Sequence, residues 1–392
     1  MTSTEAAISK PRSVLPEGMT IGRLLLDGRA FIALLVIILI FSLLSPNFFT
    51  FDNLIVMTRH VAVNALLAIG MLMVILNAGI DLSVGSTVAL TGVVAGYLLQ
   101  GVDLPLTHLV AYPAVWVVVI LSIAIGALVG LVNGILVSKF KVAPFVATLG
   151  MMYIARGIAL LITNGQTFPR LQGSEELGNT GFNWIGFNSI GFLPVGIIAM
   201  IIVAAAASFV LAKTPFGRWL YASGGNERAA ELSGVPVRSV KTGVYVISGA
   251  LAGMAGLILT SELTSATPQA GDSYELTAIA AVVIGGASLM GGKGTVRGTL
   301  IGAFVIGFLS DGLVIIGVSE YWQMVFKGAV IVLAVMLNAV DYRSRRSGRK
   351  AKDEPAGSSA SRTLAAAGLR PPPVDDAEAA QKSADSRTAG KE

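Results

Sequence analysis

The sequence contains no cysteine at any of its 392 positions and only two histidines. The lack of cysteine excludes a disulfide framework, a thiol nucleophile and a thiolate-bound metal. His60 and His108 alone are too little material for a histidine-based metal site. Charge is scarce as well, since Asp, Glu, Lys and Arg make up 13% of the chain, whereas soluble domains carry about 25%. This scarcity of charge indicates a protein that is embedded in lipid.

Long apolar runs take the place of the missing charge. About 20 consecutive apolar residues cross a bilayer, and the runs in this chain predict ten spans. The spans lie near residues 30–46, 58–77, 83–100, 109–137, 144–163, 190–211, 240–260, 275–290, 297–316 and 321–340. We therefore predict an all-α integral membrane protein of about ten transmembrane helices. The span near 83–100 begins in a segment that contains Gly and Asp, and the short span near 275–290 ends in glycines, so both are predicted to be broken or re-entrant elements.

A weak internal similarity indicates an inverted five-helix repeat. The stretch Gly126-Ala-Leu-Val-Gly130-Leu-Val-Asn-Gly134 resembles Gly298-Thr-Leu-Ile-Gly302 and the residues up to Gly307. The two stretches lie five spans apart, so they would run in opposite directions through the membrane, as inverted repeats do. Glycine-rich membrane helices also resemble one another by composition alone, and both explanations stay open.

Positive charge predicts how the chain is oriented. If the N-terminus is inside, the inner segments hold most of the Lys and Arg residues, while the outer segments are mainly acidic. Cytoplasmic loops collect Lys and Arg, so we expect both termini in the cytoplasm. The formal net charge of +5 is then explained by orientation and by attraction to anionic membrane lipid, and we expect no nucleic-acid partner.

Three regions follow from this topology. Residues 1–28 form a predicted cytoplasmic leader, because no cleavage pattern of a secretory signal precedes the first span. Residues 29–342 form the predicted transmembrane domain. Residues 343–392 are rich in Ala, Ser, Pro and mixed charges, a composition that cannot bury enough apolar surface to offset its chain entropy. They are predicted to be a disordered cytoplasmic tail.

The segment Asn77-Ala-Gly-Ile-Asp81-Leu-Ser-Val-Gly-Ser86 separates two predicted spans. A carboxylate between apolar spans is costly and indicates a functional position, and either Asp81 or Ser83 is suited to cap the helix that follows. Two interpretations stay open: a broken helix on the solute path, or a cytoplasmic-side turn in which Asp81 only caps. On the first interpretation, the pathway candidates are Asn77, Asp81, Ser83, Asn133 and Arg156.

Two further charges lie inside predicted spans. Asp311 falls in the ninth span and Lys327 in the tenth. Either residue is suited to line a polar path or to serve as a paired structural charge. For Lys327, which lies near a helix end, the structural interpretation is favoured because a long side chain there reaches the interface.

Residues 213–241 form the longest predicted inner loop. Thr214-Pro-Phe-Gly217 predicts a turn, and Asn226 followed by Glu227 predicts the N-terminus of a short helix. Gly234 and then Pro236 end that helix. We predict a docking element for another protein, although a helix lying passively on the membrane surface remains an alternative. The predicted docking residues are Arg218, Gly225, Asn226, Glu227, Ala230 and Gly234.

The string Gly291-Gly-Lys-Gly-Thr295 resembles a nucleotide-binding P-loop only at first sight. The motif requires G-x-x-x-x-G-K-[ST], but Ala287 stands at the first glycine position and Gly294 follows Lys293. Any ATP must therefore be hydrolysed by a partner subunit.

Taken together, these motifs resemble the permeases of bacterial ribose-, xylose- and galactose-type ABC importers. The matching stretches are Asn77–Ser86, Gly130–Gly134, Val142–Gly150, Thr214–Arg218, Gly224–Val235, Ile284–Thr295 and Tyr321–Gln323. They arrive in the family's order and cover nearly the whole predicted membrane region. Asn77-Ala78 stands where a glycine pair is frequent, and the long tail is atypical of the family.

The resemblance implies a transport subunit of the inner membrane that is not an enzyme and binds no cofactor or metal of its own. Such permeases pair as two copies or two related chains beneath an extracytoplasmic sugar-binding protein. An ATPase with two fused cassettes, which uses ATP and Mg²⁺, docks on their inner loops. The match at Gly224–Val235 places the coupling helix in the predicted docking element.

Three alternatives were weighed against this interpretation. An ion-coupled secondary transporter would show intramembrane carboxylates, which are few here. A branched-chain amino acid ABC permease has related architecture, but the Asp81-Leu-Ser-Val-Gly85 block favours sugars. A membrane enzyme is disfavoured because it needs a converging nucleophile, base or metal site.

Overall fold

The computed structural model describes residues 28–104, 109–191, 193–333 and 336. The predicted tail, and the predicted leader except for Gly28, lie outside these residues. The described part consists mainly of helices joined by loops and has almost no strand, which confirms the predicted all-α fold class. Its helices are α2 (Arg29–Leu44), α3 (Phe51–Leu76), α4 (Val84–Gln100), α5 (Val115–Ser138), α6 (Pro144–Thr163), α7 (Trp184–Phe187), α8 (Val195–Lys213), α9 (Pro215–Gly225), α10 (Glu227–Leu232), α11 (Val237–Leu263), α12 (Tyr274–Ile284) and α13 (Val296–Ile315). Residues 320–333 are also helical.

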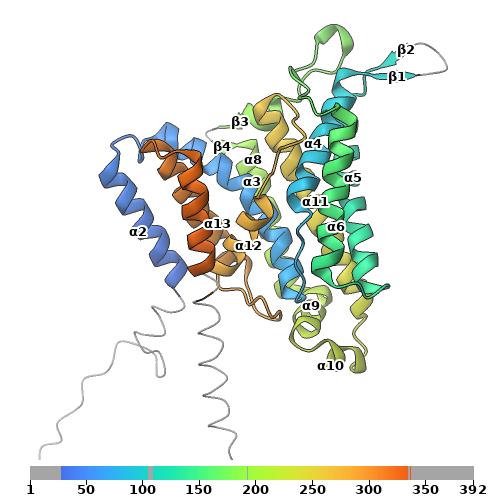
Figure 1. Cartoon of the computed structure of the whole chain (residues 1–392), viewed down its shortest axis with the longest axis vertical. Helices are drawn as coiled ribbons and strands as arrows, with labels where there is room; N and C mark the ends of the chain where they lie inside the picture. Colours follow the sequence, from blue (N-terminus) through green and yellow to red (C-terminus); the bar gives the residue numbers. More distant parts are fainter. Residues whose placement is uncertain (1–27, 105–108, 192, 334–335, 337–392) are drawn as a thin grey trace, which may run out of the picture. The chain divides into compact units, whose positions relative to one another are not determined.

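Among the described residues, strands occur only as two short antiparallel hairpins. β1 (Val102–Leu104) pairs with β2 (Leu109–Ala111), and β3 (Ser189–Ile190) pairs with β4 (Leu193–Pro194). A 3-10 turn covers Glu175–Leu177. These elements all lie at one end of the helices, whereas α9 and α10 lie at the other end (Figure 1).

Each predicted span contains one helix of the described chain. Six helices are long and apolar enough to cross a membrane, namely α3, α5, α6, α8, α11 and α13. Three shorter apolar helices, Ala30–Leu44, α4 and α12, together with residues 320–333, bring the number to ten.

Three predicted boundaries were wrong by at least six residues. α12 ends at Ile284 and not near residue 290, because Gly285 and Gly286 follow it and Gly286 has φ +89°. α3 begins at Phe51 and not near residue 58, because Thr50 is extended and Asp52 places a favourable acid in the first turn. α5 begins at Val115 and not near residue 109, because residues 109–111 pair in the hairpin and Pro113 follows them.

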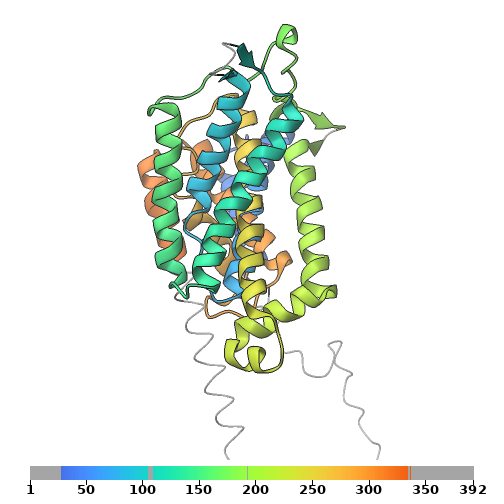
Figure 2. The ribbon, with the colours of Figure 1, turned by 90° about the vertical axis from the view of Figure 1, so that its right-hand side faces the viewer.

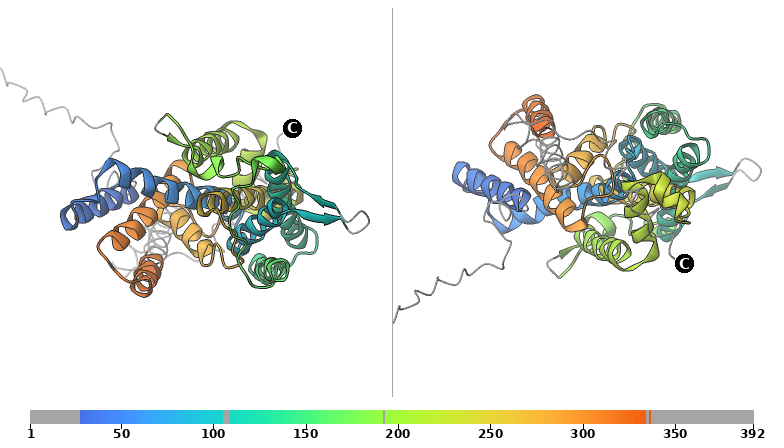
Figure 3. Two further views of the ribbon diagram at one scale, coloured as in Figure 1. Left: turned by 90° about the horizontal axis from the view of Figure 1, so that it is seen from above. Right: turned by 90° about the horizontal axis from the view of Figure 1, so that it is seen from below.

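Helix α3 forms the centre of the fold. Of its apolar window, 83% is buried, against 28% for α5 and for α6. It packs against α8, α11, α12 and α13, and Figure 3 shows it between the α2–α13 side and the α5–α6 side. The apolar side chains exposed on the outer helices are those that a lipid environment accommodates.

Helices α5 and α11 approach each other through glycines. A Cβ atom added to Gly126 would overlap the carbonyl oxygen of Gly249, and one added to Gly130 would overlap that of Tyr245. Small residues at such positions let membrane helices pack backbone to backbone. In Figure 2, α5 and α11 run side by side in the middle of the view, while α8 stands at the edge.

Candidate solute path and coupling surface

The helix break predicted after α3 is present. α3 ends at Leu76, and α4 does not begin until Val84. Asp81, which is 1% exposed, accepts hydrogen bonds from the backbone N–H of Ser83 (3.0 Å), from the Ser83 hydroxyl (2.6 Å) and from the Ser248 hydroxyl (3.0 Å). Ser83 occupies the N-cap position, but its own side chain makes no capping bond. The Asp81 carboxylate therefore fixes Ser83, the residue from which α4 begins, and ties it to Ser248 of α11.

Side chains from α5 and α6 extend this hydrogen-bond network, and a tyrosine of α11 packs against it without a hydrogen bond. Asn133 of α5 donates to the Ser83 hydroxyl (2.9 Å), and Thr148 of α6 donates to the carbonyl of Ile80 (3.1 Å). The hydroxyl of Tyr245, on α11, faces Gly79, where an added Cβ would lie 2.6 Å away. Three pathway candidates, Asp81, Ser83 and Asn133, are thus brought together in a buried cluster that ties the break to α5, α6 and α11.

The other two pathway candidates lie elsewhere. Asn77 donates to the hydroxyl of Ser223 (2.7 Å), which belongs to α9. Arg156 of α6 donates to the carbonyls of Pro268 and Ala270, so it holds the connection between α11 and α12. The five candidates therefore occupy three separate places, and their role on a solute path stays a prediction.

A polar cavity of about 260 Å³ lies toward the end opposite α9 and α10. It is enclosed by α3, by the last turns of α11 and α13, by the first turn of α12, and by the helix of residues 320–333. Its charged and hydrogen-bonding residues include His60, Asn64, Glu262, Thr277, Asp311 and Lys327. Tyr274, Val63 and Leu259 add apolar surface to the same cavity.

One ion pair and two unpaired acceptors characterise this cavity. His60 Nδ1 lies 2.9 Å from Asp311 Oδ1, with the His60 side chain 49% and the Asp311 side chain 15% exposed. The second oxygen of Asp311 and the Oδ1 atom of Asn64 are buried, and neither has a hydrogen-bond partner in the described part of the chain. Of the cavity residues, only Asp311 and Lys327 are candidates that the sequence indicated. Other polar cavity residues, such as His60 and Asn64, could have been found as polar residues inside otherwise apolar spans.

The inner loop contains two helices where one was predicted. Thr214-Pro215-Phe216-Gly217 was predicted to be a turn, but these residues begin α9. The Thr214 hydroxyl accepts from the N–H of Gly217 (3.4 Å), and Pro215 takes the first helical position, where its missing N–H costs nothing. The predicted short helix is confirmed as α10, whose N-cap Asn226 accepts from the N–H of Ala229 (3.0 Å).

Helix α9 is joined to the end of α3 and to the loop before α13. Tyr221 donates to the carbonyl of Gly294 (2.8 Å), and the N–H of Gly292 donates to the carbonyl of Leu76 (2.9 Å). Gly224 packs closely against the Leu76 carbonyl and the Gly292 nitrogen, and a Cβ atom at this position would overlap the Leu76 oxygen. The P-loop-like glycine string thus packs against α9 and α3; we call this contact the coupling joint.

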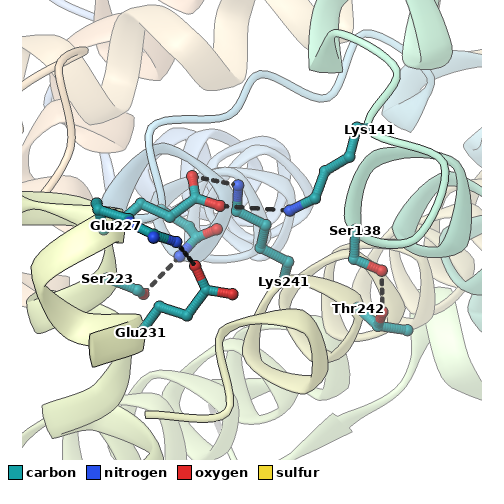
Figure 4. A network of polar contacts seen from close by, with 9 residues as sticks. Ser138, Lys141, Ser223, Glu227, Glu231, Lys241 and Thr242 are labelled. Carbon is teal, nitrogen blue, oxygen red and sulfur yellow. Dashed lines mark hydrogen bonds and ion pairs between the residues drawn. The ribbon is translucent and has the colours of Figure 1, made fainter. Parts of the chain in front are cut away.

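Helix α10 is tied to the core by charge (Figure 4). Glu227 lies 2.7 Å from the amino group of Lys241 on α11 and 3.7 Å from that of Lys141, between α5 and α6. The hydrogen bond from Lys241 is the main cause that lowers the pKa of Glu227 below its usual value, so this carboxylate is ionised at neutral pH.

The outer face of the loop is available for contact. Ala230 of α10 is buried, whereas Leu232 is 75% exposed. Of the remaining predicted docking residues, Arg218 and Gly225 are exposed on α9, and Gly234 adopts φ +82° just after α10. That conformation favours glycine at the end of a helix.

Comparison with known proteins decides the family. The protein-family model described as "Branched-chain amino acid transport system / permease component" matches residues 53–335 of this chain. The chain belongs to this permease family. It is therefore a component of a transport system and a multi-pass inner-membrane protein, as the motif resemblance predicted.

Its curated relatives align over nearly their whole length. The ribose import permease protein RbsC of Escherichia coli K12 is 47% identical over 314 residues, which cover 80% of this chain and 94% of that protein. RbsC of Bacillus subtilis 168 is 46% identical over 309 residues, covering 79% and 91%. The galactose/methyl galactoside import permease protein MglC of Escherichia coli K12 is 36% identical over 323 residues, covering 82% and 96%. No solved structure matches the chain.

Proposed function

We propose that this chain is the membrane-spanning permease subunit of an ATP-driven importer that carries a monosaccharide into the cytoplasm. The observation that carries the proposal is the coupling joint, which connects a protruding inner loop to the most buried helix of the fold. An ion-driven transporter does not require a docking surface for an ATPase, whereas an ATP-driven one needs a surface through which a partner moves its helices. D-ribose is the first substrate to test, because the permeases at 46–47% identity are named for ribose import.

The proposal includes the partners. A cassette ATPase that uses ATP and Mg²⁺ docks on residues 213–241, with the exposed face of α10 as its first contact. A sugar-binding protein delivers the solute at the opposite end, and a second permease copy, identical or related, completes the membrane unit. Both chain termini lie in the cytoplasm, since the Lys- and Arg-rich loop that carries α9 and α10 belongs inside.

Transport then proceeds by alternating access. Closure of the cassettes displaces α9 and α10, and the coupling joint passes this displacement to α3 and to the loop before α13. The break at residues 77–83 lets α3 and α4 move relative to each other. We propose that Asn77, Asp81, Ser83, Asn133 and Arg156 control the inner part of the solute path through this movement.

A pull-down with transport measurement tests the proposal. The tagged full-length chain is purified from native membranes and assayed for bound ATPase, in parallel with uptake of labelled D-ribose by the same cells. Leu232→Glu places a charge on the exposed face of α10, and Leu177→Glu is the matched control because Leu177 is an exposed leucine at the opposite end.

We expect Leu232→Glu to lose both the ATPase and uptake, while Leu177→Glu retains both. If the unchanged chain binds no ATPase and moves sugar along an ion gradient instead, the secondary-transporter alternative replaces this proposal. Uptake of leucine in place of sugar would favour the amino acid permease.

A further inference from the structure

We infer that the polar cavity between α3, α11, α12 and α13 is a binding station for one neutral sugar molecule within a single permease chain. The inference rests on the proposed import function and adds a site to it. The station would receive the sugar after the binding protein releases it and before the inner path opens.

The position of the cavity suits arrival of a solute. The last turns of α11 and α13 and the first turn of α12 form its wall, so it lies toward the end at which the binding protein would dock. His60, with 49% of its side chain exposed, gives the cavity a polar, accessible edge. The volume of about 260 Å³ is just below the roughly 300–1,000 Å³ of pockets for drug-sized ligands, which suits a smaller molecule.

Unpaired acceptors point to a ligand that donates hydrogen bonds. The Asn64 Oδ1 and Asp311 Oδ2 atoms are buried, and both lack a partner in the described part of the chain. Buried polar atoms are normally paired, so each orphan calls for a specific explanation. Both residues line the cavity, so hydroxyl groups of a bound sugar would pair with these two atoms once the side chains turn toward it.

The cavity also offers donors, and a sugar needs both kinds of partner. A hydroxyl group donates one hydrogen bond and accepts others. Lys327 forms no ion pair with any described residue, so its amino group is available as a donor. Tyr274, Val63 and Leu259 supply apolar surface on which the C–H face of a sugar ring can rest.

The balance of charge favours a neutral ligand. Asp311 is already paired with His60, and Glu262 and Lys327 carry opposite charges on separate helices. When His60 is protonated, the two acids Glu262 and Asp311 are matched by His60 and Lys327, so the cavity presents no excess of one sign that an anionic or cationic solute would neutralise. A zwitterionic amino acid is the rival ligand, because Glu262 and Lys327 would match its two charges.

The lack of natural cysteine makes a direct test possible. Ser310→Cys introduces a single thiol on the cavity wall, and Thr180→Cys introduces one on the exposed connection between α6 and α8. The complete importer is reconstituted in vesicles, and a membrane-impermeant thiol reagent is added at the outer face. The labelling rate is measured alone, with D-ribose, with D-galactose and with L-leucine, and ATP-driven uptake by the unchanged chain is recorded in parallel.

We expect the sugar that is imported to slow labelling of Ser310→Cys several-fold, without effect on Thr180→Cys. In the double variant Ser310→Cys/Asp311→Asn, the sugar concentration that gives half-maximal protection should rise by roughly 10- to 100-fold. This is the loss of affinity expected when a hydrogen bond to a charged group is removed. The double variant Ser310→Cys/Asp103→Asn, whose altered acid lies on the exposed β1 strand, is the matched control and should keep full protection.

Three results would overturn the inference. If the Ser310→Cys thiol is not labelled at all, the cavity is closed to the outside. If the thiol is labelled but no sugar slows the labelling, no sugar binds in the cavity. Protection by L-leucine alone shows the wrong class of ligand. In the first two cases continued sugar uptake by the unchanged chain leaves the import function standing, whereas absence of uptake and of bound ATPase refutes the import function itself.

Discussion

Gly224→Ala places one methyl group between α9, the end of α3 and the loop before α13. The Cβ position at Gly224 overlaps the carbonyl oxygen of Leu76 and lies 2.8 Å from the backbone nitrogen of Gly292. Those two groups are hydrogen-bonded to each other at 2.9 Å. The new methyl group must therefore separate α9 from α3 or break the bond between Leu76 and Gly292. Gly225, the next residue of the same helix, has open space at its own Cβ position.

The magnitude follows from three contributions. Forcing a methyl group into a close-packed contact costs about 1–3 kcal/mol, and leaving a buried carbonyl such as that of Leu76 unpaired costs about 1–3 kcal/mol more. Replacing glycine by alanine in a helix recovers at most about 1 kcal/mol. We expect a net loss of about 1–5 kcal/mol for Gly224→Ala, and a change between zero and a small gain for Gly225→Ala.

Two measurements on the same preparations separate the variants. Thermal unfolding of the purified chain reports stability, and ATP-driven sugar uptake in vesicles with the complete importer reports coupling. Gly224→Ala should lower the unfolding midpoint and suppress uptake, whereas Gly225→Ala should leave the unfolding midpoint near that of the unchanged chain. If the two variants have the same unfolding midpoint, the coupling joint is not close-packed and cannot transmit a displacement as proposed.

Two further predictions concern the interior. Gly130→Ala should destabilise the chain by about 1–3 kcal/mol in thermal unfolding because its methyl group meets the carbonyl of Tyr245; Gly157→Ala, with open space around it, is the control, and equal midpoints would contradict close α5–α11 packing. Asp81→Asn keeps the side-chain shape, but its neutral amide removes the charge that strengthens the hydrogen bonds from Ser83 and Ser248, so it should cost about 0.5–1.5 kcal/mol. Asp103→Asn on the exposed hairpin should cost nothing, and an unchanged midpoint for Asp81→Asn would show that its carboxylate does not hold the helix break.

Local signals explain what the sequence predicted well. The ten helices follow from apolar runs, and α10 follows from a capping residue, Asn226, with a helix-ending glycine at 234. The same kind of signal was misinterpreted at α9. Thr214 followed by proline is compatible with a turn or with a helix start, and only the packing of α9 against α3 and α11 selects the helix.

The sites escaped prediction because distant segments form them. His60 and Asp311 lie 251 positions apart, and Asn77 and Ser223 lie 146 apart. No spacing rule joins such residues, since their proximity depends on how the helices are arranged around α3. The sequence marked Asp81 as costly in the membrane, but only the structure shows that Ser83 and Ser248 provide the hydrogen bonds for it.

Helix α3 connects the two ends of the proposed mechanism. Asn64 contributes to the cavity and Leu76 to the coupling joint, and both belong to one uninterrupted helix of 26 residues, about 39 Å long at 1.5 Å per residue. A helix that is buried along most of its length moves as a unit, so a displacement at the joint reaches the cavity without a chain of intermediate side chains. Movement relative to α4 is then concentrated at residues 77–83, where side-chain hydrogen bonds replace the helical ladder. The sugar station would therefore act on the middle of α3 and the ATPase on its C-terminal end, which gives the two sites one shared element that both can bias.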